Sequence, residues 1–394
     1  MSSERIYYFD NNATTQVDPA VREAMMPFLT ESYGNPSSMH SFGGNVEKNI
    51  ERAREQVAAL LGAEPTEVIF TSCGTESDNA AILSAIETNP LKRHIVTSKV
   101  EHPAVYEYAD YCEHKGCRVT RLPVDAEGLL HVDEFRQALS DATAVASIMY
   151  ANNETGVVFP VEELAQIARE KGILFHTDAV QAVGKIPLNM KTSAVDMLSL
   201  SGHKLHAPKG VGALYVRKGT RFAPFIIGGH QERGRRAGTE NVASIVALGK
   251  ACEIAKQFID EENTRVKKLR DLLETGLVRA CSDTMVNGSR EHRLPNTTNI
   301  SFKFVEGEAI LLHFNELGIC ASSGSACTSG SLEPSRILRS MGIPYSAAHG
   351  AVRFSLSRYN TEEEVRYVIA QVPPIIENLR RISPFNENNV YTIK

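Results

Sequence analysis

Positive charge is scarce in this sequence, and so are long apolar runs. Lysine and arginine number 42 against 47 aspartates and glutamates, for a formal charge of −5, whereas a protein that binds nucleic acid mainly through its phosphates needs a basic excess. Nowhere do the 18 apolar residues of a membrane-spanning helix run without a charge, and the first residues lack the apolar core of a signal peptide. We therefore expect a cytoplasmic protein with no membrane segment and no direct nucleic-acid partner.

Cysteines are few and scattered. The seven lie at positions 73, 112, 117, 252, 281, 320 and 327, and no two form a CxxC pair. This spacing excludes a disulfide framework, and the ligand spacing of a structural zinc site is absent too. We expect most of the cysteines to be reduced core residues. We also expect no resident metal, although His102, Asp178, His203 and His206 fall near one predicted sheet edge.

The middle of the chain alternates short apolar runs with helical patterns. A chain of 394 residues is long enough for one large domain and a smaller one. Between about residues 64 and 216 the strand-like runs are VIFTS, HIVTS, RVTRLP, AVASIMY, ILFHTD, VDMLSL and VGALYV. This alternation predicts an α/β fold with a mainly parallel sheet and helices on its faces. Ligands of such sheets bind beyond the carboxyl ends of the strands.

The last third of the chain has a different pattern. Residues 242–280 predict long helices, because apolar residues recur there at spacings of three and four. The later segments NTTNISFKF, EGEAILLHFNELG and VRFSLS, with a helix from Thr361 to Arg381, mix strand and helix. We predict a large domain over residues 15–255, and a small α+β domain over 1–14 and 256–394 that carries a cysteine loop at about 320–334.

A lysine directly follows the buried strand VDMLSL, in Ser201-Gly202-His203-Lys204. An ammonium loses solvation at such a position unless it is paired or takes part in chemistry. Desolvation lowers the pKa of a lysine and yields the neutral amine that Schiff-base formation needs. The structural alternative is a lysine whose ammonium reaches solvent, and the tetrapeptide alone does not choose between the two.

The run ILFHTD ends in Asp178, three residues before Gln181. A carboxylate at this strand end suits the pyridinium nitrogen of pyridoxal phosphate (PLP), which it would keep protonated. Gln181 is placed to donate a hydrogen bond to the phenolate oxygen of the same ring. The alternative for Asp178 is to cap the segment that follows.

Three further strand ends carry polar residues. After VIFTS, Gly74 and Thr75 open a helix whose first N–H groups suit a phosphate, although a threonine there is also an ordinary N-cap. His102 follows HIVTS and would stack its imidazole on a flat ring, although a lone histidine serves many roles. Asn153 follows AVASIMY. Capping and core packing alone do not explain why five strand ends share one sheet edge, so we expect a single site there.

Motifs along nearly the whole chain carry a family resemblance. They are YFDNNATT, YGNPSSMH, TSCGTESDN, EHPAV, ANNETG, HTDAVQAVGK, SGHK, GRRAGTEN, PNTTNIS, SGSACTSG and VRFSLSRYNTEEE. With these motifs the chain resembles the cysteine desulfurases of the NifS/IscS type, which are aminotransferase class V enzymes of PLP fold-type I. The resemblance implies PLP as cofactor, a homodimer, and a large domain with a seven-stranded sheet.

The resemblance also implies a role for each matching residue. Lys204 would form the Schiff base with PLP, Asp178 would pair with the ring nitrogen, and His102 would stack on the ring. The other implied cofactor-binding residues are Gly74, Thr75, Asn153, Gln181, Ser201, His203 and Thr239, the last reaching the phosphate in the other subunit. Asn153 and Arg353 would hold the substrate carboxylate, which suits an arginine fork, although an ion pair at the domain interface is the alternative for Arg353.

Cys327 lies among small polar residues in SSGSACTSGS. A structural cysteine normally has apolar neighbours, so we expect an accessible thiol on a mobile loop. In the reaction that the resemblance implies, Lys204 moves the Cα proton of L-cysteine, and His102 assists proton transfer. The Cys327 thiolate takes the sulfur as a persulfide and alanine leaves. The implied catalytic residues are thus Cys327, Lys204 and His102.

A persulfide needs an acceptor. The resemblance suggests an iron–sulfur scaffold protein of the NifU or IscU type, with Cys327 transiently ligating the cluster, or a tRNA-thiolation relay. Selenocysteine lyase or another aminotransferase-like PLP enzyme is the alternative function on the same scaffold. A non-catalytic sulfur carrier is the alternative of another class.

Overall fold

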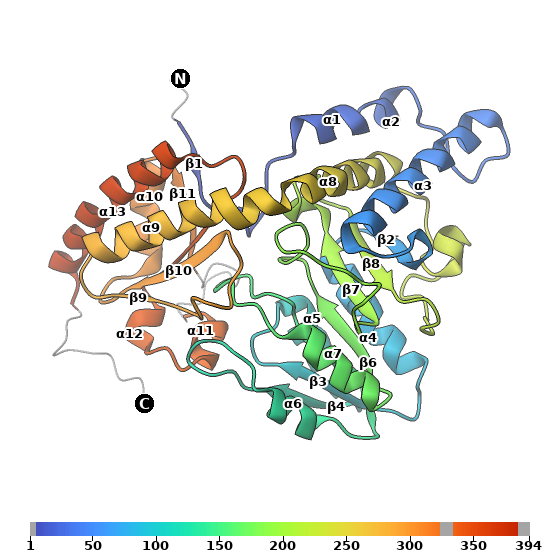
Figure 1. Ribbon diagram of the computed structural model, residues 1–394, viewed down its shortest axis with the longest axis horizontal. Coiled ribbons are helices and arrows are strands. Elements are labelled where there is room, and N and C mark those ends of the chain that lie inside the picture. The colour runs from blue at the N-terminus through green and yellow to red at the C-terminus, as the bar shows by residue number, and fades with distance from the viewer. Residues whose placement is uncertain (1–4, 324–333, 385–394) are drawn as a thin grey trace.

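The computed structural model describes residues 5–323 and 334–384, and a seven-stranded sheet lies at its centre (Figure 1). In spatial order the strands are β2 (Val68–Thr71), β8 (Gly212–Val216), β7 (Met197–Ser201), β6 (Leu174–Asp178), β5 (Thr143–Ser147), β3 (His94–Ser98) and β4 (Arg118–Leu122). Only β8 runs antiparallel to its neighbours. The predicted α/β fold with a mainly parallel sheet is therefore confirmed.

Helices cover both faces of this sheet, and its strands other than β4 are buried along nearly their whole length. Alternate residues of one strand serve different cores: Val68 and Phe70 pack into the larger one, and Ile69 into the smaller. The larger core includes side chains of α3 (Ser41–Leu61), α6 (Val132–Ala138), α7 (Val161–Glu170) and α8 (Val242–Glu261). The smaller core includes those of α4 (Gly74–Glu87) and α5 (Pro103–His114).

The remaining short elements of this half connect or flank the sheet. They are α1 (Pro19–Met25), α2 (Pro27–Thr30) and the 3₁₀ turns Pro65–Glu67, Gly202–Lys204 and Gln231–Gly234. Helix α8 continues through a π-helical turn, Glu262–Val266, into α9 (Lys267–Ala280). Figure 1 shows the two helices as one long rod that reaches from the large sheet to the other half of the molecule.

That other half is built on a four-stranded antiparallel sheet. Its strands, in spatial order, are β12 (Ser322–Ser323), β13 (Ala351–Ser355), β10 (Thr297–Phe302) and β9 (Thr284–Val286). A parallel pair, β1 (Tyr7–Tyr8) and β11 (Ile319–Cys320), lies beside α10 (Gly307–Glu316), α11 (Arg336–Ser340), α12 (Tyr345–Ala348) and α13 (Glu362–Ile382). A separate core joins Phe9 to side chains of α9, α10, α13 and this sheet.

The molecule consists of two halves, each built on its own sheet. The two halves have separate hydrophobic cores, and residues of segment 5–12 pack with the second half. The limits at residues 14/15 and 255/256 stay a prediction. None of the helices in the described segments has the length and apolarity to cross a membrane.

Candidate active site

A cavity of about 330 Å³ lies at the carboxyl ends of the parallel strands. It is lined by Asn12, Ala13, Cys73, Gly74, Thr75, Asp78, His102, Met149, Ala151, Asn153, Glu154, Asp178, Val180, Gln181, Ser201, His203, Lys204, Ser322, Ser323 and Arg353. Ten of the predicted site residues are in this set. Thr239 is exposed and does not line the cavity, and Cys327 lies outside the described residues.

Lys204 ends the 3₁₀ turn that follows β7. Its Nζ donates hydrogen bonds to the carbonyl oxygens of Asn12 and Ala13, each at 2.7 Å. Burial lowers the pKa of Lys204 to about 7, and the positive charges of Lys185 and Arg353 act in the same direction. The lysine therefore does not extend into solvent, and a large fraction of it is a neutral amine near pH 7.

Asp178 and Gln181 lie on the turn that leaves β6. Asp178 Oδ1 accepts a hydrogen bond from the Val180 amide at 2.9 Å, so the residue caps the turn and also lines the cavity. Burial raises the pKa of Asp178, and the nearby His102 partly offsets this. Gln181 Nε2 donates to the Asn12 carbonyl at 3.0 Å, and its Oε1 has no partner among the described residues.

His102 is the N-cap of α5. Its Nδ1 accepts the backbone N–H of Ala104 at 3.1 Å, which assigns the ring proton to Nε2. Burial lowers the pKa of His102. The cavity thus receives a neutral imidazole of fixed orientation, as ring stacking requires.

The first turn of α4 forms another part of the cavity wall. Cys73, not Thr75, is the N-cap, because its Sγ accepts the N–H of Glu76 at 3.5 Å. A Cβ on Gly74 would lie 2.8 Å from Val180 Cγ2, so only glycine fits between this turn and the next strand end. The Thr75 hydroxyl and the N–H groups that precede Glu76 are left for a ligand.

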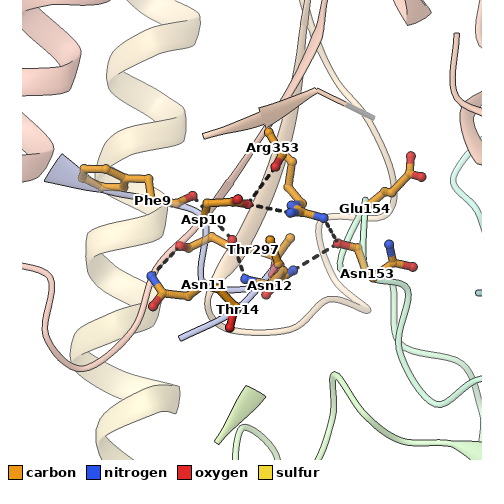
Figure 2. A network of polar contacts seen from close by, with 12 residues as sticks. Phe9, Asp10, Asn11, Asn12, Thr14, Asn153, Glu154, Thr297 and Arg353 are labelled. Atoms are coloured by element: carbon orange, nitrogen blue, oxygen red, sulfur yellow. Dashed lines mark hydrogen bonds and ion pairs between the residues drawn. The ribbon is translucent and has the colours of Figure 1, made fainter. Parts of the chain in front are cut away.

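Arg353, on β13, comes from the smaller sheet. Figure 2 shows its guanidinium between two acceptors: Nη2 donates to Asp10 Oδ1 at 2.6 Å, and Nη1 donates to the Asn153 carbonyl at 3.0 Å. Nε is buried without a partner among the described residues. Ser322 Oγ donates to the same Asp10 oxygen at 2.9 Å. The ion pair considered as an alternative is therefore present, and the arginine still lines the cavity.

Sequence reasoning missed the organising role of Asn12. Its carbonyl accepts from Lys204 and Gln181. Its Nδ2 donates to the Asn153 carbonyl at 3.2 Å and to Thr297 Oγ1 at 2.9 Å. The signal was available in the motif YFDNNATT, but without the fold it indicated only the resemblance.

Asp78, on α4, was missed as well. It is fully buried, and its Oδ1 lies 3.6 Å from Nε2 of His176, a strand residue that also contacts Ser147 at 2.8 Å and Ser199 at 2.9 Å. Burial and the neighbouring Asp178 raise the pKa of Asp78 well above its ordinary value. An ionised Asp178 therefore favours the protonated form of Asp78.

The cavity fits PLP by the chemistry of its lining. Four buried polar atoms there have no partner within the described chain: Asp78 Oδ1, Asn153 Oδ1, Gln181 Oε1 and Arg353 Nε. Buried polar groups of a folded protein are normally paired, so such a concentration indicates a ligand. The helix that starts at Gly74 and Thr75 suits the phosphate of PLP, and the buried acid suits its ring nitrogen. The neutral imidazole suits the face of the ring, and the neutral amine suits the aldehyde.

The sequence of this chain is similar to a known family and to characterised proteins. The family model described as aminotransferase class-V matches residues 7–368. A cysteine desulfurase of Nostoc sp. is 60% identical over 383 residues, which cover 97% of this chain and 96% of that relative. The cysteine desulfurase NifS of Azotobacter vinelandii is 58% identical over 97% of this chain and 95% of its own length.

A solved structure agrees with these sequence relatives. It is titled NifS-like protein and superimposes with a TM-score of 0.89 at 41% identity, over 95% of this chain and 100% of that one. The residues that the family model matches, 7–368, include both sheets and every residue that lines the cavity. This chain belongs to the aminotransferase class-V family.

Proposed function

We propose that this chain is a PLP-dependent cysteine desulfurase, which converts L-cysteine to L-alanine and transfers the sulfur to an enzyme cysteine. The observation that carries the proposal is one cavity in which the amine of Lys204, the buried carboxyl of Asp178 and the guanidinium of Arg353 converge. The relatives named cysteine desulfurase, at 58–60% identity, support the choice of substrate.

The proposed cofactor contacts follow from the lining. Gly74, Thr75, Ser201 and His203 would hold the phosphate, and Asn153 and Gln181 would bond the ring substituents. Asp178 would hold the ring nitrogen and His102 would face the ring. When bound, PLP supplies the electron sink that stabilises negative charge at the substrate Cα.

The chain's own groups would then act in sequence. Arg353 binds the substrate carboxylate through its fork, with Asn153 beside it. Lys204, as a neutral amine, takes the proton from Cα. The Cys327 thiolate forms a bond to the substrate sulfur while the substrate C–S bond breaks. The bonding pair stays with the carbon, so a persulfide remains on Cys327 and protonation of the carbon gives alanine.

We further propose a cytoplasmic homodimer. Thr239 would reach the phosphate of the partner subunit, which its exposed position supports. The six described cysteines are all free, as expected in a reducing compartment. The persulfide acceptor would be an iron–sulfur scaffold protein of the NifU or IscU type, a choice supported by relatives that carry the name NifS.

Mass spectrometry after incubation with L-cysteine tests the proposal. We expect one added sulfur on Cys327 and one alanine released for each sulfur transferred. Cys327→Ser should lose both products, whereas the matched variant Cys320→Ser, at a partly buried cysteine seven positions earlier, should keep them. Alanine formation from selenocysteine but not from cysteine would instead identify a selenocysteine lyase. Amino transfer to a keto acid would identify an aminotransferase.

A further inference from the structure

Lys204 also lines a second, much smaller cavity. Its volume of about 20 Å³ is enough for one water molecule. Five titratable side chains line it: Lys185, Lys204, His206, Glu262 and Arg358. Of these, only Lys204 has a part in the proposed reaction, and Lys185 and Glu262 are the two that are buried with opposite charges.

Lys185 is a buried cation. Only 7% of its surface is exposed, and its Nζ donates to the Gln181 carbonyl at 3.0 Å. A buried ammonium costs several kcal/mol unless an opposite charge compensates it. Burial lowers the pKa of Lys185, and the charge of Glu262 acts in the opposite direction.

Glu262 is the opposite charge. It is the first residue of the π-helical turn between α8 and α9, is 7% exposed, and its Oε2 has no partner in the described part of the chain. The next residue, Asn263, donates to the Lys185 carbonyl at 2.8 Å and fixes the turn against it. Turns of this kind occur frequently at functional sites.

Stability does not account for this pair. Lys185 Nζ bonds the Gln181 carbonyl and Glu262 Oε2 has no partner in the described part of the chain, so no direct bond between the two offsets the cost of burying their charges. The pair lies beside Lys204, and after burial the charge of Lys185 has the largest effect on the protonation of that amine. Its position therefore points to the chemistry of the amine.

We propose that Lys185 and Glu262 are positioning residues that hold Lys204 as a neutral amine, with Lys185 opposing its protonation and Glu262 keeping Lys185 charged. The inference rests on the proposed role of Lys204 as the cofactor lysine. It explains the neutral state of Lys204 in part by two residues that lie outside the substrate cavity.

Other charges also face these groups. Arg353 opposes protonation of Lys204, and Asp10 and Asp178 favour it. Arg358, Glu261 and Arg265 act on Glu262, each less than Lys185 does. The test must therefore change Lys185 and Glu262 while these neighbours stay in place.

The readout is the pH at which the visible absorption of the holoenzyme, with PLP joined to Lys204, changes. Lys185→Met removes a positive charge and keeps an unbranched side chain one atom shorter, so protonation of the Lys204 nitrogen becomes easier. We expect the midpoint to rise by about one pH unit, a tenfold change in proton affinity. Lys185→Arg keeps the charge and should leave the midpoint in place. Glu262→Gln should raise it by a smaller amount.

The matched control is Lys191→Met, at an exposed lysine whose Nζ lies 3.0 Å from Glu64. It should leave the midpoint unchanged. An unchanged midpoint in Lys185→Met, or an equal shift in Lys185→Arg, would overturn the inference. If Lys185→Met does not fold, an unchanged midpoint in Glu262→Gln overturns it. Failure of the underlying function differs, because Lys204→Ala would then keep the visible absorption.

Discussion

The seven-stranded sheet has one cavity at the carboxyl ends of its parallel strands, here the carboxyl edge, and another at their amino ends, the opposite edge. The two cavities differ in whether their polar groups have hydrogen-bond partners within the protein. At the carboxyl edge, four buried polar atoms in a cavity of about 330 Å³ have no partner within the described residues. The cavity at the opposite edge is larger, about 460 Å³, and is lined by Asp196 and Arg217 among others. Size alone would not have selected the carboxyl edge.

The opposite edge uses its charges to satisfy the backbone. Arg217 donates to the carbonyl oxygens of Met190, Ser193 and Val195, at 2.7 to 3.2 Å. Asp196 Oδ2 accepts the N–H of Phe175 at 2.8 Å. Groups with all their bonds within the protein stabilise it, and groups left without partners are available to a ligand.

Lys204→Ala should have the largest effect on the carboxyl edge. Loss of the amine removes both the attachment of PLP and the base, so alanine formation from cysteine should fall by about 10⁴-fold. Thermal stability should fall only modestly, because the amine bonds two carbonyl oxygens and one of them, that of Asn12, keeps the hydrogen bond from Gln181. The exposed Lys191→Met variant is the control. Retention of alanine formation in Lys204→Ala would show that the cavity at the carboxyl edge is not the active site.

Arg353→Ala should raise the KM for cysteine by about 100-fold, since it removes charge-assisted bonds to the substrate carboxylate. Arg353→Lys keeps the charge but not the fork and should give an intermediate KM. Steady-state kinetics at saturating PLP measures both. A normal KM together with reduced stability would show that Arg353 serves only as the ion-pair partner of Asp10.

Arg217→Ala should have the reverse effect at the opposite edge. It leaves three carbonyl oxygens without their donor, so the free energy of unfolding in urea should fall by about 2 kcal/mol. The KM and kcat should remain within about twofold of the parent. Lys218→Met, at the exposed neighbouring residue, should change neither. A large kinetic effect of Arg217→Ala would mean that the two edges are not functionally distinct.

The smallest expected effect is the dependence of the rate on pH. Burial lowers the pKa of Lys204 to about 7, so the amine loses its function as a base below that pH. The value of kcat/KM should fall about tenfold per pH unit on the acid side. Because the pKa of His102 is also lowered, its ring should stay neutral through this range. An acid limb that persists unchanged in Lys185→Met would assign the titration to another group.

Much of the fold could be predicted because its signals are local. Each run from VIFTS to VGALYV became a strand of the predicted sheet, and all of these strands except the partly exposed β4 are buried along nearly their whole length. The strand ends then placed Lys204, Asp178 and His102 at one edge, since parallel strands align their carboxyl ends.

The contacts that could not be predicted join distant parts of the chain. Asp10 bonds Arg353 across 343 positions, and Asn12 bonds Lys204 across 192. No spacing rule indicates such pairs. Asp78 escaped notice for another reason: a polar residue within a helix usually faces solvent, and only the packing of α4 against the sheet buries it.

The position of the segment from Asp10 to Ala13 determines when the protein becomes active during folding. Its partners are separated from it by most of the chain, and contacts of such sequence separation form slowly because the intervening loop must first close. Apart from β2, which pairs with β8, the large sheet can assemble from strands that are close in sequence. The carbonyl oxygens that hold Lys204 arrive only when residues 10–13 reach β13. During refolding, native-like helix content should therefore appear before turnover, and the interval between them measures the docking of this segment.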